Sequence, residues 1–504
     1  MADTPRYTFG PLERRGLLLG LGPLQLSTIA AGLVLAVGAR AGLGGTAGLI
    51  SAVAVLLASL AGALWTREGR PLVARGGIAA AWLLRNRAGP SFDPAPTSGS
   101  ATGVREGRVG GRAAPGPRRM VPGITVLEDP GLPGEEPLGV IRDSRSGTWA
   151  AVLAVRGAPL ALLDPPDQSR CLEGWRQVLG SLCRPGSPVA KVQWVQRSWS
   201  GSAAGTEYFD GLGSDGGPAA PGRPRPRSVS GSGGASPASP SESYRQSSAE
   251  VAPHVTYHDT WLVVAVGSAG ERFAHQPGRR RGDEVLAGLR REMRLLGAQL
   301  TAVDLRPGPP LDGGELADLI RRPHEEAARS RRRAARPWPT AVEDRWSCCR
   351  ADGMWHATFW VAEWPRVDVG PDFLGPLLLG EGRRSVSLIM APVGSERAER
   401  EVRSARTADT ADRELRARAG FLASARRQRE ADGVERREEE LAEGHHEFRF
   451  SGYVTVSGPD AETLATACAE VEHAAQSCRL ELRRLYGRQL EALTWTLPLG
   501  RGLR

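Results

Sequence analysis

The sequence predicts an α+β protein in which an amino-terminal two-helix transmembrane hairpin is followed by a cytoplasmic mixed α/β-sandwich body with long charged helices. Three observations predict this class. Residues 17–65 are almost entirely apolar, residues 123–197 and 250–504 alternate strand-like with helix-like patterns, and residues 394–443 are densely charged.

The hairpin is predicted from two runs, 17–38 and 41–65, which contain no charged residue. Each is at least as long as the roughly 20 residues that a helix needs to cross a bilayer. Residues 39–41, with Arg40 at their centre, form the expected turn, and Pro23 places the start of the membrane portion near Leu24. Small residues at four-residue spacing favour close helix packing, as in Gly44 with Gly48 and Ala58 with Gly62.

The arginines around the hairpin predict its orientation. Only Arg40 lies in the turn, whereas many arginines flank the pair, and positively charged flanks stay in the cytoplasm. We therefore expect an inner (plasma) membrane protein with two helices and both termini cytoplasmic. A signal peptide or two soluble core helices are the alternatives, but a signal peptide leaves the second, longer run unexplained. The flanking arginines are Arg6, Arg14, Arg15, Arg67, Arg70, Arg75, Arg85 and Arg87.

The net charge of +9 comes almost entirely from arginine, and Lys191 is the only lysine. A basic chain suits either nucleic acid or an anionic membrane surface. The arginines that follow the hairpin favour membrane lipid, because each adds about 1 kcal/mol of attraction near an anionic leaflet. Six cysteines without zinc-ligand spacing indicate reduced thiols.

The composition changes along the chain divide it into six parts. Residues 198–249 are rich in Gly, Ser and Pro and cannot bury enough apolar surface to offset their ordering entropy. The segment after this linker has a strand, helix, strand pattern, which indicates that the linker interrupts a single sheet. No internal repeat is evident in the sequence. The parts are a cytoplasmic amino-terminal segment (1–16), the hairpin (17–65), a basic juxtamembrane tether (66–122), a β-rich module with one helix (123–197), a disordered linker (198–249) and an α+β domain (250–504) that contains the charged helical segment 394–443.

Within these parts the hydrophobic periodicity predicts individual elements. A short interfacial helix is expected at 79–84, anchored by Trp82, and the aromatic segment 353–366 reads as a central strand. Breaks in the charged segment are expected near Gly420 and Gly433, with Phe421-Leu422 docking on the body. Further strands are expected at 138–141, 149–155, 160–163, 189–195, 254–266, 299–305, 385–390, 448–456 and 480–482, and helices at 165–183, 283–297, 316–320 and from 459 onward.

The sequence contains no recognisable catalytic motif. A P-loop needs Lys followed by Ser or Thr, but Val192 follows Lys191, so a Walker ATPase is excluded. His356 and Glu363 are an odd number of positions apart on one strand and point to opposite faces. The pair His445-His446 fits a polar helix terminus better than a metal site. We name no catalytic, cofactor-binding or metal-binding residue, and we expect a non-enzymatic protein without a cofactor.

Several motifs taken together resemble a known family. They accompany the hairpin and are WHATFWVAEWPR at 355–366, RSARTAD at 403–409, FSGYVTV at 450–456, RRLYG at 483–487 and LPLG at 497–500. In this combination the chain resembles the actinobacterial PrgI-like membrane proteins associated with type IV secretion and conjugation-like loci.

The resemblance implies a fusion of a small two-helix inner-membrane subunit with the non-catalytic amino-terminal domain of a conjugation ATPase. The expected role is a membrane platform that docks a separate ATPase, contacts other secretion-system subunits and forms a homo-oligomer. The chain ends shortly after the LPLG motif, beyond which the motor would begin, and the linker 198–249 departs from a compact domain. Two alternatives stay open, an inner-membrane component of a type VII secretion system and a membrane-tethered nucleic-acid-binding protein.

Overall fold

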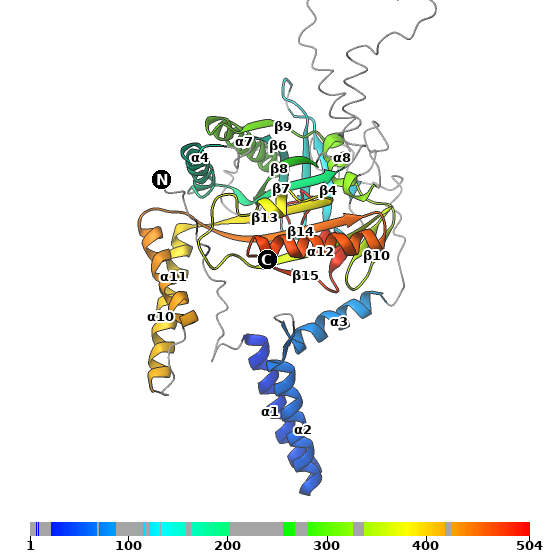
Figure 1. The fold of residues 1–504 in the computed structure, drawn as a ribbon, viewed down its shortest axis with the longest axis vertical. Helices are drawn as coiled ribbons and strands as arrows, with labels where there is room; N and C mark the ends of the chain where they lie inside the picture. The colour runs from blue at the N-terminus through cyan, green and yellow to red at the C-terminus, as the bar shows by residue number, and fades with distance from the viewer. Residues whose placement is uncertain are drawn as a thin grey trace, which may run out of the picture.

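The computed structural model shows an α+β body and two apolar helices that project from it (Figure 1). The amino-terminal segment and the 198–249 linker lie largely outside the residues that the structure describes, as does the predicted strand 160–163 except for Leu163. The described residues are 7, 9, 22–67, 70–86, 114–115, 120–131, 133–157, 163–184, 186–200, 256–267, 281–325, 337–418 and 425–503.

The two projecting helices are α1 (Pro23–Leu43) and α2 (Gly45–Leu64). The turn between them lies at Gly44 and not at 39–41 as predicted, because Arg40 is part of the last turn of α1. Gly44 has a φ of 59°, in the left-handed region that glycine adopts without a steric penalty. Pro23 occupies the first helical turn, where its missing N–H is not needed.

The described residues of the body form a sheet of thirteen strands, in which every strand pair is antiparallel. The strands follow the order β10, β11, β12, β14, β13, β7, β8, β6, β5, β4, β3, with β15 on β12 and β9 on β6. Strands β7 and β8 pair directly, so the division of the body at the linker does not divide the sheet. The bounds are β3 (Ala114–Pro115), β4 (Ile124–Asp129), β5 (Leu138–Asp143), β6 (Thr148–Arg156), β7 (Val189–Ser200), β8 (Thr256–Gly267), β9 (Arg306–Pro310), β10 (Val342–Asp344), β11 (Cys349–Ala351), β12 (Met354–Glu363), β13 (Arg383–Val393), β14 (Glu447–Gly458) and β15 (Glu481–Arg484).

The sheet consists of two halves with the same succession of elements. In the first half the hairpin β5–β6 is followed by helix α4 (Pro165–Leu182), β7, β8, helix α7 (Arg281–Ala302) and β9. In the second half β11–β12 is followed by helix α9 (Gly375–Leu378), β13, β14, helix α12 (Ala461–Ser477) and β15. The last strand of each half returns to the second, since β9 pairs with β6 and β15 with β12. The body is therefore a structural duplication that the sequence patterns did not reveal.

The two halves join through their third strands. Strand β7 pairs with β13 at the centre of the sheet, from Val192 opposite Met390 to Ser198 opposite Arg384. Because this pair is antiparallel, the halves run in opposite directions across one continuous sheet.

The four helices of the repeated units cover one face of the sheet. The apolar stripe of α7 packs on β6 and β8, and that of α12 packs on β12 and β14. Strand β12 is rich in aromatic and β-branched residues and has buried residues on both faces, as expected of a central strand. Burial of these stripes supplies the main stabilisation of the body, at about 25 cal/mol per Å² of apolar surface.

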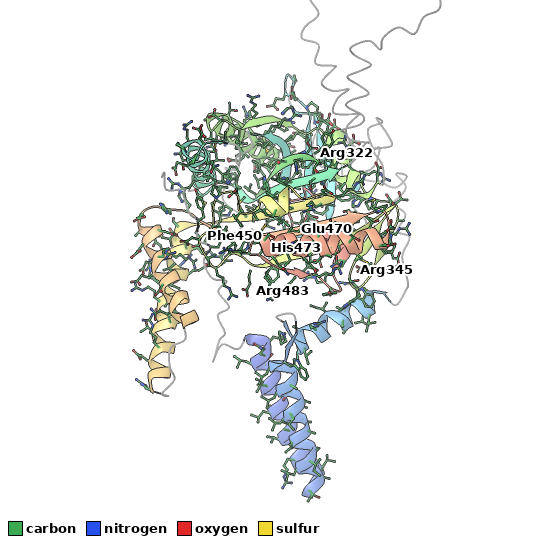
Figure 2. All side chains as sticks on the ribbon, in the orientation of Figure 1. Arg322, Arg345, Phe450, Glu470, His473 and Arg483 are labelled. Carbon is green, nitrogen blue, oxygen red and sulfur yellow. The ribbon has the colours of Figure 1, made fainter. Side chains whose placement is uncertain are left out.

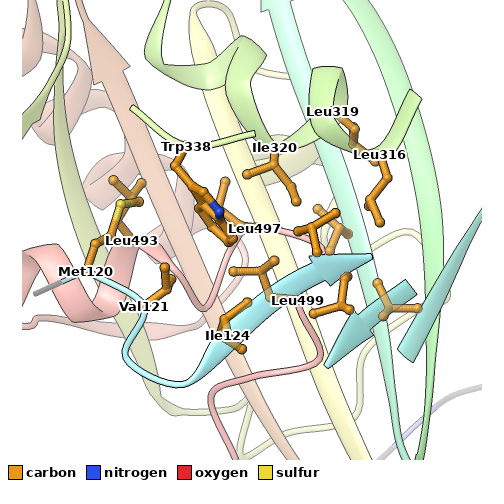
Figure 3. Packing of buried hydrophobic residues seen from close by; sticks show 14 of the residues in the cluster. Met120, Val121, Ile124, Leu316, Leu319, Ile320, Trp338, Leu493, Leu497 and Leu499 are labelled. Atoms are coloured by element: carbon orange, nitrogen blue, oxygen red, sulfur yellow. The ribbon is translucent and has the colours of Figure 1, made fainter. Parts of the chain in front are cut away.

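The other face is covered by α8 (Gly313–Arg321), the 3-10 helix η3 (Arg322–His324), α13 (Gln489–Leu493) and the segment that follows α13. Figure 3 shows Trp338, Leu497 and Leu499 converging with Ile124 on this face. A buried glutamine of β7, Gln193, hydrogen-bonds the segment that follows α13. Its side-chain nitrogen donates to the backbone oxygens at positions 495 and 497, at 3.1 and 2.9 Å, and its oxygen accepts from the backbone at 500, at 2.7 Å.

Between β13 and β14 the chain forms two antiparallel helices, α10 (Ser395–Arg418) and α11 (Ala425–Ala442), which project from the side of the body (Figure 1). They contact each other through a small apolar cluster of Val402, Ala405 and Val434. The break predicted near Gly433 is wrong, because this residue lies inside α11. Residues 419–424, which include Phe421-Leu422, lie outside the described residues.

The strand predicted at 299–305 is also wrong. Helix α7 continues to Ala302 because Leu300 extends its apolar stripe into the core, and the strand begins only at Arg306. The other predicted strands and helices of the described residues are confirmed with shifted ends, as in α4 and α12.

Candidate membrane anchor and its junction with the body

The outer surface of α1 and α2 is apolar and exposed. Both helices are long and hydrophobic enough to cross a membrane, and the exposed side chains include Val34 at 71% and Ile50 at 70%. A continuous apolar surface of this kind is rare on a soluble monomer and is typical of contact with lipid or with another apolar surface. The other exposed leucines and valines of the two helices are Leu24, Leu33, Leu35, Val37, Leu43, Leu49, Val53, Leu57 and Leu64.

Small residues bring the two helices close together. Gly32 lies so close to the Ser59 side chain that a Cβ there would overlap it, and a Cβ at Gly48 would lie 3.2 Å from the Arg40 backbone oxygen. A hydrogen bond also joins the two helices, because Gln25 Nε2 donates to the Ala63 backbone oxygen at 2.8 Å. Of the small residues predicted at the contact, Gly48 faces α1, whereas Ala58 is exposed.

Helix α3 (Leu72–Asn86) connects the anchor to the body and is longer than the predicted 79–84 helix. A two-stranded turn of β1 (Thr66–Arg67) and β2 (Arg70–Pro71) leads into it, and the Leu72 backbone N–H donates to Trp65. In Figure 1, α3 turns away from the axis of α1 and α2 and runs along the underside of the body. Leu83 and Leu84 remain exposed on its surface.

The end of α3 packs against a loop of the body. The Trp82 ring meets the Trp346 ring edge to face, with centroids 5.6 Å apart, and Trp346 in turn stacks on Tyr486. Arg85 donates to the Gly487 backbone oxygen and lies 3.8 Å from the Asp344 carboxylate. Trp82 therefore contacts the body, and its role as an interfacial anchor stays a prediction.

Gly487 is required at the centre of this junction. Its φ of 70° lies in the left-handed region, and its N–H donates to the Trp346 backbone oxygen at 2.7 Å. A Cβ at this position would lie 2.7 Å from the Trp346 ring and 2.9 Å from Ile78 of α3. The absence of a side chain is therefore what lets α3 approach the body.

The flank that precedes α1 also contacts the body. Tyr7 and Val369 exchange two backbone hydrogen bonds of 2.9 and 3.0 Å. The Phe9 ring stacks on Trp364 at 5.1 Å and lies 5.4 Å from the Phe373 ring. Both flanks of the apolar hairpin are thus attached to the same body, one through Tyr7 and Phe9 and the other through α3.

His356 and Glu363 do not form a shared site, as their odd spacing on one strand predicts. His356 is buried in β12, where its Nδ1 lies 2.8 Å from the Ser457 hydroxyl and its Nε2 lies 3.3 Å from His324 Nδ1. Burial, followed by the charges of Arg383 and Arg197, lowers the pKa of His356 to about 3. Glu363 instead pairs with Arg366 near the end of the strand.

The remaining candidates lie apart from one another. Lys191 lies in β7, where burial lowers its pKa, and His445-His446 follow the end of α11. The six cysteines are free thiols, and the described residues contain no group of three or more His, Cys, Asp or Glu that could hold a metal ion. The structure brings none of these residues together into one site.

The junction residues were not identified from the sequence. Trp82 was assigned to the membrane interface, and Trp346 and Tyr486 were not connected with it, because they are far apart in the chain. The only signal was the aromatic residue beside glycine in the RRLYG motif, which pointed to a family and not to a contact.

No protein-family model matches the chain, and a search of curated proteins finds no significant relative.

Proposed function

We propose that this chain is a non-catalytic platform component of a type IV secretion or conjugation-like apparatus, held in the inner membrane, which docks a separate ATPase. The observation that carries the proposal is the attachment of both flanks of the apolar hairpin to one α+β body. Such an arrangement suits a part whose task is to hold a large folded body at a fixed place on a membrane.

Membrane insertion is supported by the surface of the hairpin. Transfer of exposed side chains such as Val34 and Ile50 from water to lipid is favourable by about 1.5–3 kcal/mol each. The hairpin also satisfies its backbone hydrogen bonds internally, as a lipid environment requires.

The cytoplasmic location of both termini is supported by two independent features. Tyr7 and α3 contact the same body, so the two flanks lie on one side of the hairpin. Arginine is abundant in the flanks, whereas Arg40 alone lies near the turn at Gly44. A cleaved signal peptide fits this arrangement poorly, since the segments before and after the apolar helices both pack on the body.

A separate motor is inferred from the family resemblance together with the sequence. The resemblance is to proteins that join a two-helix membrane subunit to the non-motor domain of a conjugation ATPase. No Lys in this chain is followed by Ser or Thr, so the chain has no P-loop of its own. ATP-driven work would then come from a partner, and several copies of the chain would surround it.

Purification of the full-length chain in a gentle detergent tests the proposal. The chain is expressed together with the ATPase encoded beside it, and only the chain carries an affinity tag. We expect the ATPase to co-elute in a complex larger than one copy of the chain. A solitary monomer without bound ATPase contradicts the proposal, and salt-sensitive retention on DNA would favour a nucleic-acid-binding role instead.

A further inference from the structure

A group of polar side chains, three of them buried, lies at the end of the body away from the apolar hairpin. We call it the Arg197 cluster and define it as Arg197, Asp259, Arg322, His324 and His356. The residues come from β7, β8, η3 and β12, and they meet beside the carboxyl end of α8. Figure 2 labels Arg322 on this side of the body.

Arg197 is the central residue of the cluster. Its side chain is 5% exposed and makes one hydrogen bond, from Nη1 to the Leu319 backbone oxygen at 2.7 Å, and its guanidinium lies over the Trp261 ring at 5.3 Å. The Nε and Nη2 atoms are buried and have no hydrogen-bond partner among the residues that the structure describes. Burial lowers the pKa of Arg197 to about 9, and the guanidinium is therefore still mainly protonated at neutral pH. A buried charge with unpaired donors is costly in free energy.

The neighbours of Arg197 compensate for this charge only in part. Asp259 lies opposite Arg197 in the β7–β8 pair and its charge partly offsets that of the guanidinium, but no ion pair joins the two among the described residues. Arg322 is exposed and adds a second positive charge, while His324 and His356 are held neutral because burial lowers their pKa values. His324 Nε2 is also buried and has no hydrogen-bond partner in the described part of the chain. The cluster has two guanidinium groups and one carboxylate, and so it carries an excess positive charge.

Two other part-buried arginines of the body have several hydrogen-bond partners each, as expected of arginines with a structural role. Arg290 is 15% exposed along its side chain and donates to the Asp129 carboxylate, to the Asp129 backbone and to the Glu136 backbone. Arg321 similarly donates to Glu325, Asp352 and the Trp338 backbone. Arg197 is more deeply buried than either, yet two of its three side-chain nitrogens have no partner among the described residues, whereas Arg384 and Arg484 each leave one buried nitrogen unpaired. This larger deficit points to a polar group outside the described residues that receives the Arg197 donors.

We propose that the Arg197 cluster binds an oxyanion, the phosphate or carboxylate group of a ligand, through the free Nε and Nη2 of Arg197 with Arg322 at the solvent side. The Nε and one Nη of a guanidinium form a planar fork that matches two oxygens of such a group. The neutral His324 adds a neighbouring ring nitrogen, which donates or accepts according to its tautomer. This site is independent of the proposed membrane platform role, because it lies in the body and needs neither the hairpin nor the ATPase.

Thermal unfolding and calorimetry of the full-length chain in detergent test the site. The probes are sodium phosphate, pyrophosphate and citrate, each compared with sodium chloride at the same ionic strength. We expect one of them to raise the Tm and to bind with a Kd below about 1 mM. A response to phosphate or pyrophosphate alone identifies a phosphorylated ligand, and a response to citrate identifies a carboxylate.

The variants separate a binding role from a structural one. Arg197→Met is expected to weaken anion binding at least about tenfold while leaving the Tm without anion equal to or above that of the parent chain. Arg290→Met is the control, expected to lower the Tm and keep the anion response. If Arg197→Met does not fold, Arg322→Met at the exposed side provides the same binding test. The inference is wrong if no probe binds more tightly than chloride, or if both variants of the cluster bind the anion as the parent does.

Discussion

At the scale of single residues, the junction between α3 and the body depends on Gly487. The change Gly487→Ala should destabilise the chain by about 2–3 kcal/mol, because it adds a clash with Trp346 and Ile78 to the strain of a positive φ. Gly382→Ala is a matched control, since Gly382 has a φ of 85° with open space around it and should cost only about 1 kcal/mol. Urea unfolding of both variants measures the difference. Equal losses would show that the contact with α3 contributes nothing.

A second residue-scale prediction concerns His356. Its folded pKa of about 3 lies below the unfolded value of about 6.5, so the unfolded chain takes up the proton first as the pH falls. The stability present at pH 7 is therefore lost progressively below pH 6.5, by about 2 kcal/mol for this histidine at pH 5. Urea unfolding between pH 5 and 7 should show a smaller decrease for His356→Gln than for the parent chain. His473→Gln, at an exposed position of α12, should keep the parental slope, and a parental slope in His356→Gln as well would contradict the prediction.

At the scale of elements, α3 connects the apolar hairpin to the body. Trp82→Ala removes the ring that packs on Trp346, and amide protection in α3 and at Gly487 should fall about tenfold or more in hydrogen exchange. Leu84→Ala, at an exposed position of the same helix, should leave this protection unchanged. A loss of protection in both variants, or in neither, would mean that the tryptophan contact does not hold the two parts together.

The elements also show what the sequence could predict. Helices α4 and α12 were predicted because each has one clear periodicity and a defined start, such as Pro165 in the first turn of α4. Strand β12 was predicted from its aromatic and β-branched residues, with apolar side chains on both faces. The segment after Gly297 was misassigned because its short apolar run fits a strand as well as the end of a helix. The junction and the Arg197 cluster could not be predicted, since both join residues that are distant in the chain, such as Trp82 with Trp346 and Arg197 with His324.

At the scale of the whole molecule, both flanks of an apolar hairpin contact one body, which is built on a duplicated antiparallel sheet (Figure 1). The duplication was not visible in the sequence because the connection from β13 to β14 forms α10 and α11, whereas the equivalent connection from β7 to β8 is a Gly, Ser and Pro-rich segment. The two halves conserve the order of strands and helices but not the lengths of their connections.

The central claim is that α1 and α2 cross the membrane while the body stays on the cytoplasmic side, and site-directed labelling tests it most directly. A cysteine is introduced either at Thr46, an exposed position beside the turn, or at Ser395, an exposed position of the body. Cells that express each variant, and that have no outer membrane to exclude the reagent, are treated with a membrane-impermeant maleimide. The labelling of the parent chain, through its six native thiols, is the background that is subtracted. We predict labelling above background of Thr46→Cys in intact cells and of Ser395→Cys only after lysis. Labelling of Ser395→Cys in intact cells, or of Thr46→Cys only after lysis, would contradict the account.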